Sequence, residues 1–147
     1  MKKLLTLAVV CMALTATATA QDKGLGLRFS GASEYGAEVS YQQPLQENHR
    51  LEADLGFFDW GGIGLTGIYQ WVWKLDDLSE GFAWYAGPGA GLRFGDGIGA
   101  AIVGQIGIEY TLQDLPLQFS LDARPGIPFG FKDLGYGGAA LSIRYKF

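Results

Sequence analysis

Residues 82–112 read FAWYAGPGAGLRFGDGIGAAIVGQIGIEYTL, and apolar and polar side chains alternate on both sides of a central turn. The large apolar residues fall on alternate positions, at Phe82, Trp84, Leu92, Phe94, Ile98, Ile102, Ile106, Ile108 and Tyr110. The positions between them carry Tyr85, Arg93, Gln105 and Glu109. Asp96-Gly97 tolerates the positive φ that a tight hairpin turn requires. The stretch therefore predicts a β-hairpin with one apolar and one polar face.

The same period of two recurs along the rest of the chain. It predicts eight strands, at residues 24–33, 35–43, 50–58, 63–75, 82–94, 98–112, 117–125 and 137–147. Each has about ten residues, the length that a tilted strand needs to cross a bilayer. We therefore predict an all-β protein, an eight-stranded antiparallel up-and-down β-barrel. Pro88 falls inside one strand, where a closed barrel offers no free edge, so a bulge or a change of register is expected there.

The first twenty residues have the composition of an export signal. Lys2 and Lys3 precede an apolar run at 4–14, and Ala18-Thr19-Ala20 supplies the small residues that a signal peptidase recognises. We expect cleavage after Ala20, which leaves residues 21–147 as the barrel domain. A lipoprotein modification of Cys11 is disfavoured because Val10, which precedes it, is not small.

The composition excludes several classes of function. The 147 residues carry a formal charge of −4, whereas a nucleic-acid-binding surface is basic. One Cys and one His rule out a Cys/His zinc cage. We therefore expect no metal, no cofactor and no nucleic-acid partner. The 23 glycines and the many aromatic residues, with only 18% charged residues, are typical of a β-rich chain.

The charges and the glycines share one face of the predicted strands, and the bulky apolar side chains share the other. An eight-stranded barrel has an interior just wide enough for side chains to fill, so small residues belong on its concave side. Trp, Phe and Ile then lie outside, where they must face lipid. A transmembrane barrel with a side-chain-filled lumen is predicted, and its lumen charge network comprises Arg28, Glu38, Glu52, Asp54, Arg93, Glu109, Asp122, Arg124 and Arg144.

Aromatic residues gather near the two ends of the predicted strands. Near the periplasmic rim they form an expected girdle that includes Trp71, Trp73, Trp84, Tyr110 and Tyr145. Such girdles lie at the level of the lipid headgroups in membrane barrels.

The last residues, Ser142-Ile143-Arg144-Tyr145-Lys146-Phe147, end the chain on an aromatic after alternating apolar positions. With the signal peptide and the eight strands, this segment resembles the small eight-stranded outer-membrane proteins of Gram-negative bacteria, of the OmpX type or the OmpA membrane domain. The resemblance implies location in the outer membrane, contact with its lipid, and insertion by the barrel-assembly machinery. It implies that Tyr145 and Phe147 serve as the assembly signal.

The sequence predicts no catalytic residue. His49, the single histidine, falls in a predicted periplasmic link and has no neighbouring Ser, which disfavours a Ser-His hydrolase. Residues 62–67 have the letters of a dinucleotide fingerprint, but a strand follows them where that motif requires a helix. The acidic turn with Asp76, Asp77 and Glu80 is interpreted as a solvated link, and a weak divalent-cation site is the alternative.

We therefore expect a non-enzymatic envelope protein, with a structural role or a protein partner at the 126–136 link, where Phe129 and Phe131 are predicted to be exposed. Two alternatives remain open at this point. One is a narrow pore of low conductance along the charged lumen. The other is a soluble exported carrier of the lipocalin kind, in which the two faces are exchanged.

Overall fold

The computed structural model describes residues 23–31, 36–58, 61–130 and 137–147. The signal peptide expected at 1–20 and most of the link after Phe129 lie outside these residues. The strands are β1 (Gly24–Ser30), β2 (Ala37–Gln46), β3 (His49–Phe57), β4 (Ile63–Lys74), β5 (Phe82–Phe94), β6 (Ile98–Thr111), β7 (Leu117–Ala123), β8 (Gly126–Phe129) and β9 (Ala139–Lys146). Within the described residues, we find no helix that is long and apolar enough to cross a membrane.

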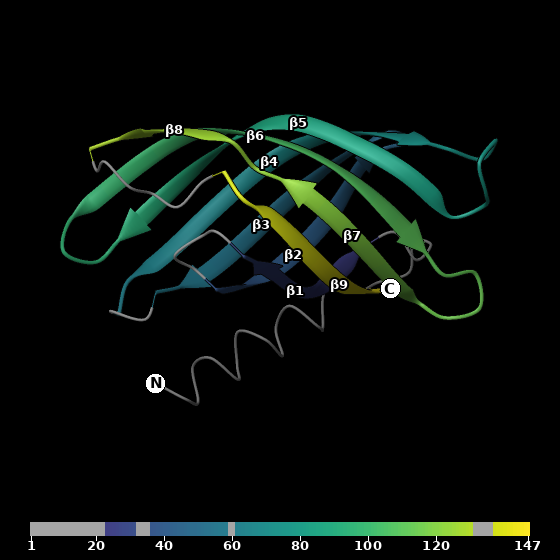
Figure 1. The fold of residues 1–147 in the computed structure, drawn as a ribbon, viewed down its shortest axis with the longest axis horizontal. Helices are drawn as coiled ribbons and strands as arrows, with labels where there is room; N and C mark the ends of the chain where they lie inside the picture. The colour runs from purple at the N-terminus through teal and green to yellow at the C-terminus, as the bar shows by residue number, and fades with distance from the viewer. Residues whose placement is uncertain (1–22, 32–35, 59–60, 131–136) are drawn as a thin grey trace.

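The strands form one closed antiparallel sheet (Figure 1). The order runs β5-β4-β3-β2-β1-β9-β7-β6-β8, and pairing of β5 with β6 closes the ring. β7 and β8 pair with successive halves of β6 in one register, since Ala123 faces Ile106 and Gly126 faces Val103. They are therefore one strand interrupted at Arg124 and Pro125, and the predicted eight-stranded antiparallel barrel is confirmed.

β8 corrects the extent of the predicted 126–136 link. Residues 126–129 belong to the barrel wall rather than to a link. Pro125-Gly126 has the composition of a turn, but the first half of the long strand β6 needs a partner on this side. Ile127 pairs with Ile102, and Phe129 pairs with Ala100. The side chains of Ile102, Ile127 and Phe129 are exposed on the outer surface, whereas Ala100 is half-buried.

The strand registers fix the tilt of the strands. If the paired residues are followed from strand to strand around the closed sheet, the path returns to β1 about ten residues away from its starting residue. This stagger accompanies the strand tilt of about 35–45° that is usual in closed barrels. A tilted strand of about ten residues spans the apolar height of an outer-membrane barrel.

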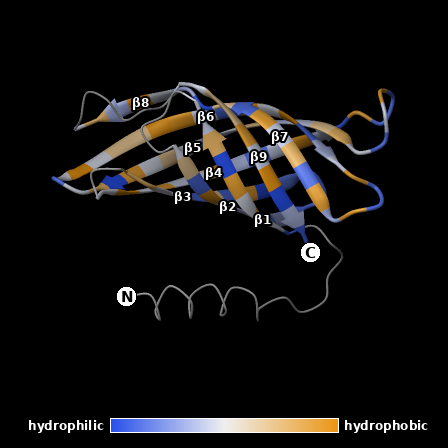
Figure 2. Cartoon of the chain, turned by 60° about the horizontal axis from the view of Figure 1, so that its bottom comes forward, coloured by the Kyte–Doolittle hydropathy of each residue, from blue (hydrophilic) through white to orange (hydrophobic). Residues whose placement is uncertain are grey.

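Inward and outward residues differ sharply in polarity. Apolar and polar residues alternate along the strands, as Figure 2 shows. Buried polar and charged residues outnumber buried hydrophobic ones, and the buried hydrophobic cluster is limited to Ile68, Ala101 and Val103. The exposed large hydrophobic side chains come from every strand of the barrel.

Glycines allow neighbouring strands to approach each other very closely at two places, called here the corners of the barrel. A Cβ on Gly26 of β1 would overlap the carbonyl oxygen of Ile143 on β9. On the opposite side, a Cβ on Gly87 of β5 would overlap the carbonyl oxygen of Tyr69 on β4. Glycine in a strand commonly marks such a close approach of backbones. The two corners divide the barrel into a half made of β1–β4 and a half made of β5–β9.

Pro88 produces neither the bulge nor the change of register that the sequence predicts. The β4–β5 register is the same on both sides, since Ile68 faces Gly89 and Trp71 faces Ala86, and only the two pairs between them are missing. Gly104, the β6 partner of Pro88, donates its N–H to Pro125, away from β5. The nitrogen of Pro88 therefore faces β4. Because proline has no N–H to donate to β4, two residue pairs between β4 and β5 are missing at this position, and the register of β5 is unchanged.

Candidate functional site

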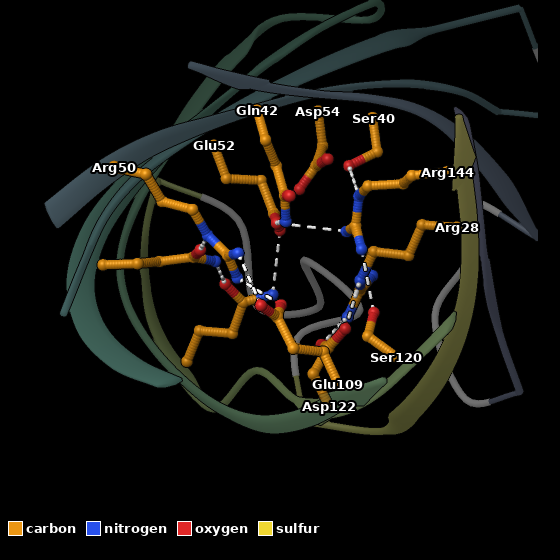
Figure 3. A network of polar contacts seen from close by, with 12 residues as sticks. Arg28, Ser40, Gln42, Arg50, Glu52, Asp54, Glu109, Ser120, Asp122 and Arg144 are labelled. Atoms are coloured by element: carbon orange, nitrogen blue, oxygen red, sulfur yellow. Dashed lines mark hydrogen bonds and ion pairs between the residues drawn. The ribbon is translucent and has the colours of Figure 1, made fainter. Parts of the chain in front are cut away.

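The interior of the barrel holds a network of buried arginines and carboxylates (Figure 3). Arg28 on β1 binds Asp122 through two nitrogens, with Nε–Oδ2 and Nη2–Oδ1 distances of 3.2 and 2.6 Å. Its third nitrogen contacts Glu38 Oε2 on β2 at 2.5 Å. Because all three side chains are buried, each charge depends on these partners for its stabilisation.

Arg124 reaches across the lumen from the interruption between β7 and β8. Its Nη1 lies 3.4 Å from Glu38 Oε1, and its Nη2 lies 3.2 Å from Glu52 Oε1. The same Nη2 contacts Asp54 Oδ2. Arg124 therefore connects the β7–β8 strand to β2 and β3 on the other half of the barrel.

Arg144 on β9 provides a second connection to β3. Its Nη2 donates to Glu52 Oε2 at 3.0 Å, while Nε and Nη1 donate to Ser40 and Ser120 at 3.0 and 2.8 Å. Glu52 also accepts from Gln42 and Gln105, at 2.8 and 3.0 Å. Glu52 is thus the central carboxylate of the network.

Arg50 also belongs to the network, although it is not among the lumen charges predicted from the sequence. Nη1 and Nη2 bind Glu109 at 2.9 and 2.6 Å, and Nε binds Gln70 at 2.5 Å. Its guanidinium also lies over the ring of Tyr85, 4.8 Å from the centroid. The alternation of the strand does place Arg50 on the same face as Glu52 and Asp54. Arg50 lies at the very start of β3, however, where the alternating pattern only begins.

The structure brings eight of the nine predicted lumen charges into this network, all of them buried. Arg93, the ninth, is half-buried and packs over the ring of Phe58, with Cζ 4.3 Å from the centroid. The buried charges are the arginines 28, 50, 124 and 144 against the five carboxylates of Glu38, Glu52, Asp54, Glu109 and Asp122. Within the part of the chain that the structure describes, Asp54 Oδ1 has no hydrogen-bond partner, so the negative charge of this carboxylate has the weakest compensation of the five.

The predicted aromatic girdle lies on the outside, near the end where β1 begins and β9 ends, called here the terminal end. Trp73 and Trp84 stack with their ring centroids 4.2 Å apart, and Tyr110 packs on Phe82 at 4.6 Å. Trp71 lies edge-on to Tyr69 at 5.0 Å, and Tyr145 stacks on Phe147 at 6.3 Å. Pairs of this kind present both an apolar ring and a polar edge to the surroundings.

His49 begins β3 instead of lying in a link, which corrects its predicted place. Its Nδ1 lies 2.8 Å from the hydroxyl of Tyr69, and its ring packs against the rings of Tyr69 and Trp71. Register with β4 explains this position, because His49 pairs directly with Trp71. The histidine is therefore part of the outer aromatic surface.

A cavity of about 970 Å³ opens at the terminal end of the barrel. Its lining includes the buried pair Arg50 and Glu109, together with Gln118. Lys74, Glu80 and Lys146 also line it. Among the described residues, no group of three or more His, Cys, Asp and Glu side chains is placed to hold a metal ion.

Comparisons with models of protein families, with curated proteins and with solved structures found no match for this chain.

Proposed function

We propose that this chain is an integral outer-membrane β-barrel protein with a structural role in the envelope and no catalytic activity. The observation that carries the proposal is the polarity of the barrel, which is apolar outside and charged inside. Leu27, Ile102 and Phe119 exemplify the outer surface, being 44, 58 and 44% exposed. Monomeric soluble proteins rarely expose contiguous apolar patches of more than a few hundred Å², and here such residues surround the whole barrel.

Other features support location in the outer membrane. The aromatic girdle at the terminal end suits the level of the headgroups, where Trp and Tyr are enriched. Tyr145, near the end of β9, is exposed on the outer surface, and its ring stacks on that of Phe147, which fits an assembly signal read by edge pairing with an unfinished barrel. Export by a signal peptide cleaved after Ala20 completes this proposal.

The soluble carrier is disfavoured by the contents of the barrel. A carrier of apolar ligands needs an apolar cavity inside and a polar surface outside. Here the interior contains Arg28, Glu52 and Arg144, each buried and bonded to other interior side chains. These side chains fill the middle of the lumen, where an apolar ligand of such a carrier would lie.

We expect the protein to fractionate with the outer membrane and to migrate faster on a gel before heating than after. A closed barrel in which every strand is paired resists detergent until it is boiled. The measurement is envelope fractionation followed by electrophoresis of unheated and heated samples. Recovery in the soluble fraction, with no shift on heating, contradicts the proposal.

The pore alternative gives a different expected result in planar bilayers. Because the ion pairs of Arg124 and Arg144 cross the lumen, we expect no current steps above the baseline in molar salt. Step currents whose frequency rises with the amount of protein would instead establish a conducting pore. Heat-denatured protein is the control, since it contains no barrel.

A further inference from the structure

We propose that a recess at the terminal end of the barrel binds the headgroup of a phospholipid that carries both a phosphate and a primary ammonium, a phosphoethanolamine. The recess lies between the β2–β3 turn and the end of β4, beside the larger cavity described above. The inference rests on the proposed membrane location, because only a barrel in a bilayer meets such a headgroup at this level. It adds a preferred lipid to that location.

Two opposite charges line the recess, which has a volume of about 580 Å³. Its lining residues are Glu47, Asn48, Val72, Trp73 and Lys74. Among the described residues, neither the Glu47 carboxylate nor the Lys74 ammonium has an ion-pair partner. Asp76 and Glu80 line the larger cavity but not the recess. A ligand with one charge of each sign therefore matches the recess, whereas a simple anion or cation leaves one of its charges uncompensated.

Hydrogen bonds and ring stacking hold the walls of the recess. Val72 donates its N–H to the carbonyl oxygen of Asn48 at 2.9 Å, which extends the pairing of β3 and β4 to the edge of the recess. Trp73 stacks on Trp84 of β5, with the ring centroids 4.2 Å apart. The recess therefore belongs to the paired wall of the barrel rather than to a free link.

Two ring nitrogens lie beside the recess, on the side of the middle of the barrel. His49 follows Asn48, Trp71 precedes Val72, and the two rings belong to directly paired residues of β3 and β4. We assign the Tyr69 hydroxyl as the donor to His49 Nδ1, at 2.8 Å, which leaves the proton of the neutral ring on Nε2. Trp71 is 37% exposed and brings an indole N–H. Donors thus lie between the apolar outer surface and the two charges of the recess.

This order of groups matches the order of atoms in the headgroup. In a phospholipid the phosphate joins the glycerol, so it lies nearer the acyl chains, and the ammonium is attached beyond it. A lipid whose chains lie on the apolar wall brings its phosphate to the donors His49, Trp71 and Lys74. The ammonium then reaches the acceptors Glu47 and Asn48 in the turn. The aromatic girdle lies at the same end, as expected for the level of the headgroups.

Two other headgroups fit the recess less well. A phosphoglycerol headgroup has the phosphate but no cation, so it leaves Glu47 uncompensated. A phosphocholine headgroup has a cation without N–H groups, so it cannot donate a hydrogen bond to Glu47 or Asn48. We therefore expect a phosphoethanolamine lipid to be preferred over both when the acyl chains are the same.

The test is native mass spectrometry of the detergent-purified barrel, titrated with phosphoethanolamine, phosphocholine and phosphoglycerol lipids that share their acyl chains. We expect the phosphoethanolamine lipid to bind about fivefold more tightly than the phosphoglycerol lipid, since it adds one exposed ion pair. Glu47→Gln should remove this preference. Lys74→Met should weaken the binding of all three lipids by about threefold, because each carries the phosphate.

The matched control is Asp114→Asn, which removes an exposed carboxylate from the β6–β7 link at the same end of the barrel, outside the recess. We expect this variant to keep the preference. Equal binding of the three lipids, or loss of the preference in Asp114→Asn as well as in Glu47→Gln, overturns the inference.

The heat-dependent gel shift, measured on the same preparation, separates this failure from failure of the proposed function. A membrane-extracted barrel that shifts on heating and binds all three lipids equally loses only its headgroup site. Recovery of the protein in the soluble fraction overturns both the membrane location and the headgroup site.

Discussion

Arg124→Met should lower the free energy of unfolding by about 3–5 kcal/mol, because it leaves buried carboxylates without their counter-charge. Arg124 contacts Glu38, Glu52 and Asp54, all of them buried carboxylates. The methionine fills similar volume, so lost charge rather than a cavity accounts for the loss. The measurement is urea unfolding in lipid vesicles, followed by tryptophan fluorescence.

Two further variants separate the network from general damage to the barrel. Arg93→Met removes a half-buried arginine that packs over Phe58, and we expect a loss of only about 1 kcal/mol. Asp54→Asn in the Arg124→Met background should recover roughly half of the loss, because it removes the carboxylate that depends most on Arg124. Equal losses for Arg124→Met and Arg93→Met would show that a buried arginine of the network contributes no more stability than a half-buried one outside it.

Gly26→Ala should destabilise the barrel by about 3 kcal/mol, or prevent it from closing, because the new Cβ overlaps backbone rather than a movable side chain. The carbonyl oxygen of Ile143 and the Cα of Arg144 occupy that space. The overlap can be removed only if β1 and β9 move apart, and the pairing of these first and last strands is needed to close the barrel. The measurement is the fraction of protein that shows the heat-dependent gel shift, followed by urea unfolding of that fraction.

Gly67→Ala and Gly104→Ala are the matched controls for this corner. Both glycines lie within strands, and no other described residue, apart from their two chain neighbours, has an atom within 4 Å of the position that a Cβ would take. We expect these variants to match or slightly exceed the stability of the parent protein, since alanine loses less backbone entropy than glycine. If Gly26→Ala unfolds at the same urea concentration as Gly67→Ala, β1 and β9 have room for a Cβ between them.

The sequence alone was sufficient for the fold class and for which side chains face inward. The alternation of Trp84 with Tyr85, or of Leu51 with Glu52, is a local property of a strand, because successive side chains point to opposite faces. The size of the residues then decided which face is concave, since an eight-stranded barrel has room only for small or closely packed interior side chains.

Only the tertiary structure decided which charges meet and where neighbouring strands approach most closely. Arg50 and Glu109, or Arg124 and Asp54, are far apart in the chain, and their contacts depend on registers added up across several strands. The direction of the Pro88 nitrogen, toward β4, likewise depends on the hydrogen bond from Gly104 to Pro125 on the other side of β6. The strand β8 likewise forms only because it pairs with β6. Local periodicity specifies the face that a residue occupies, whereas its height and its neighbours follow from the closure of the whole barrel.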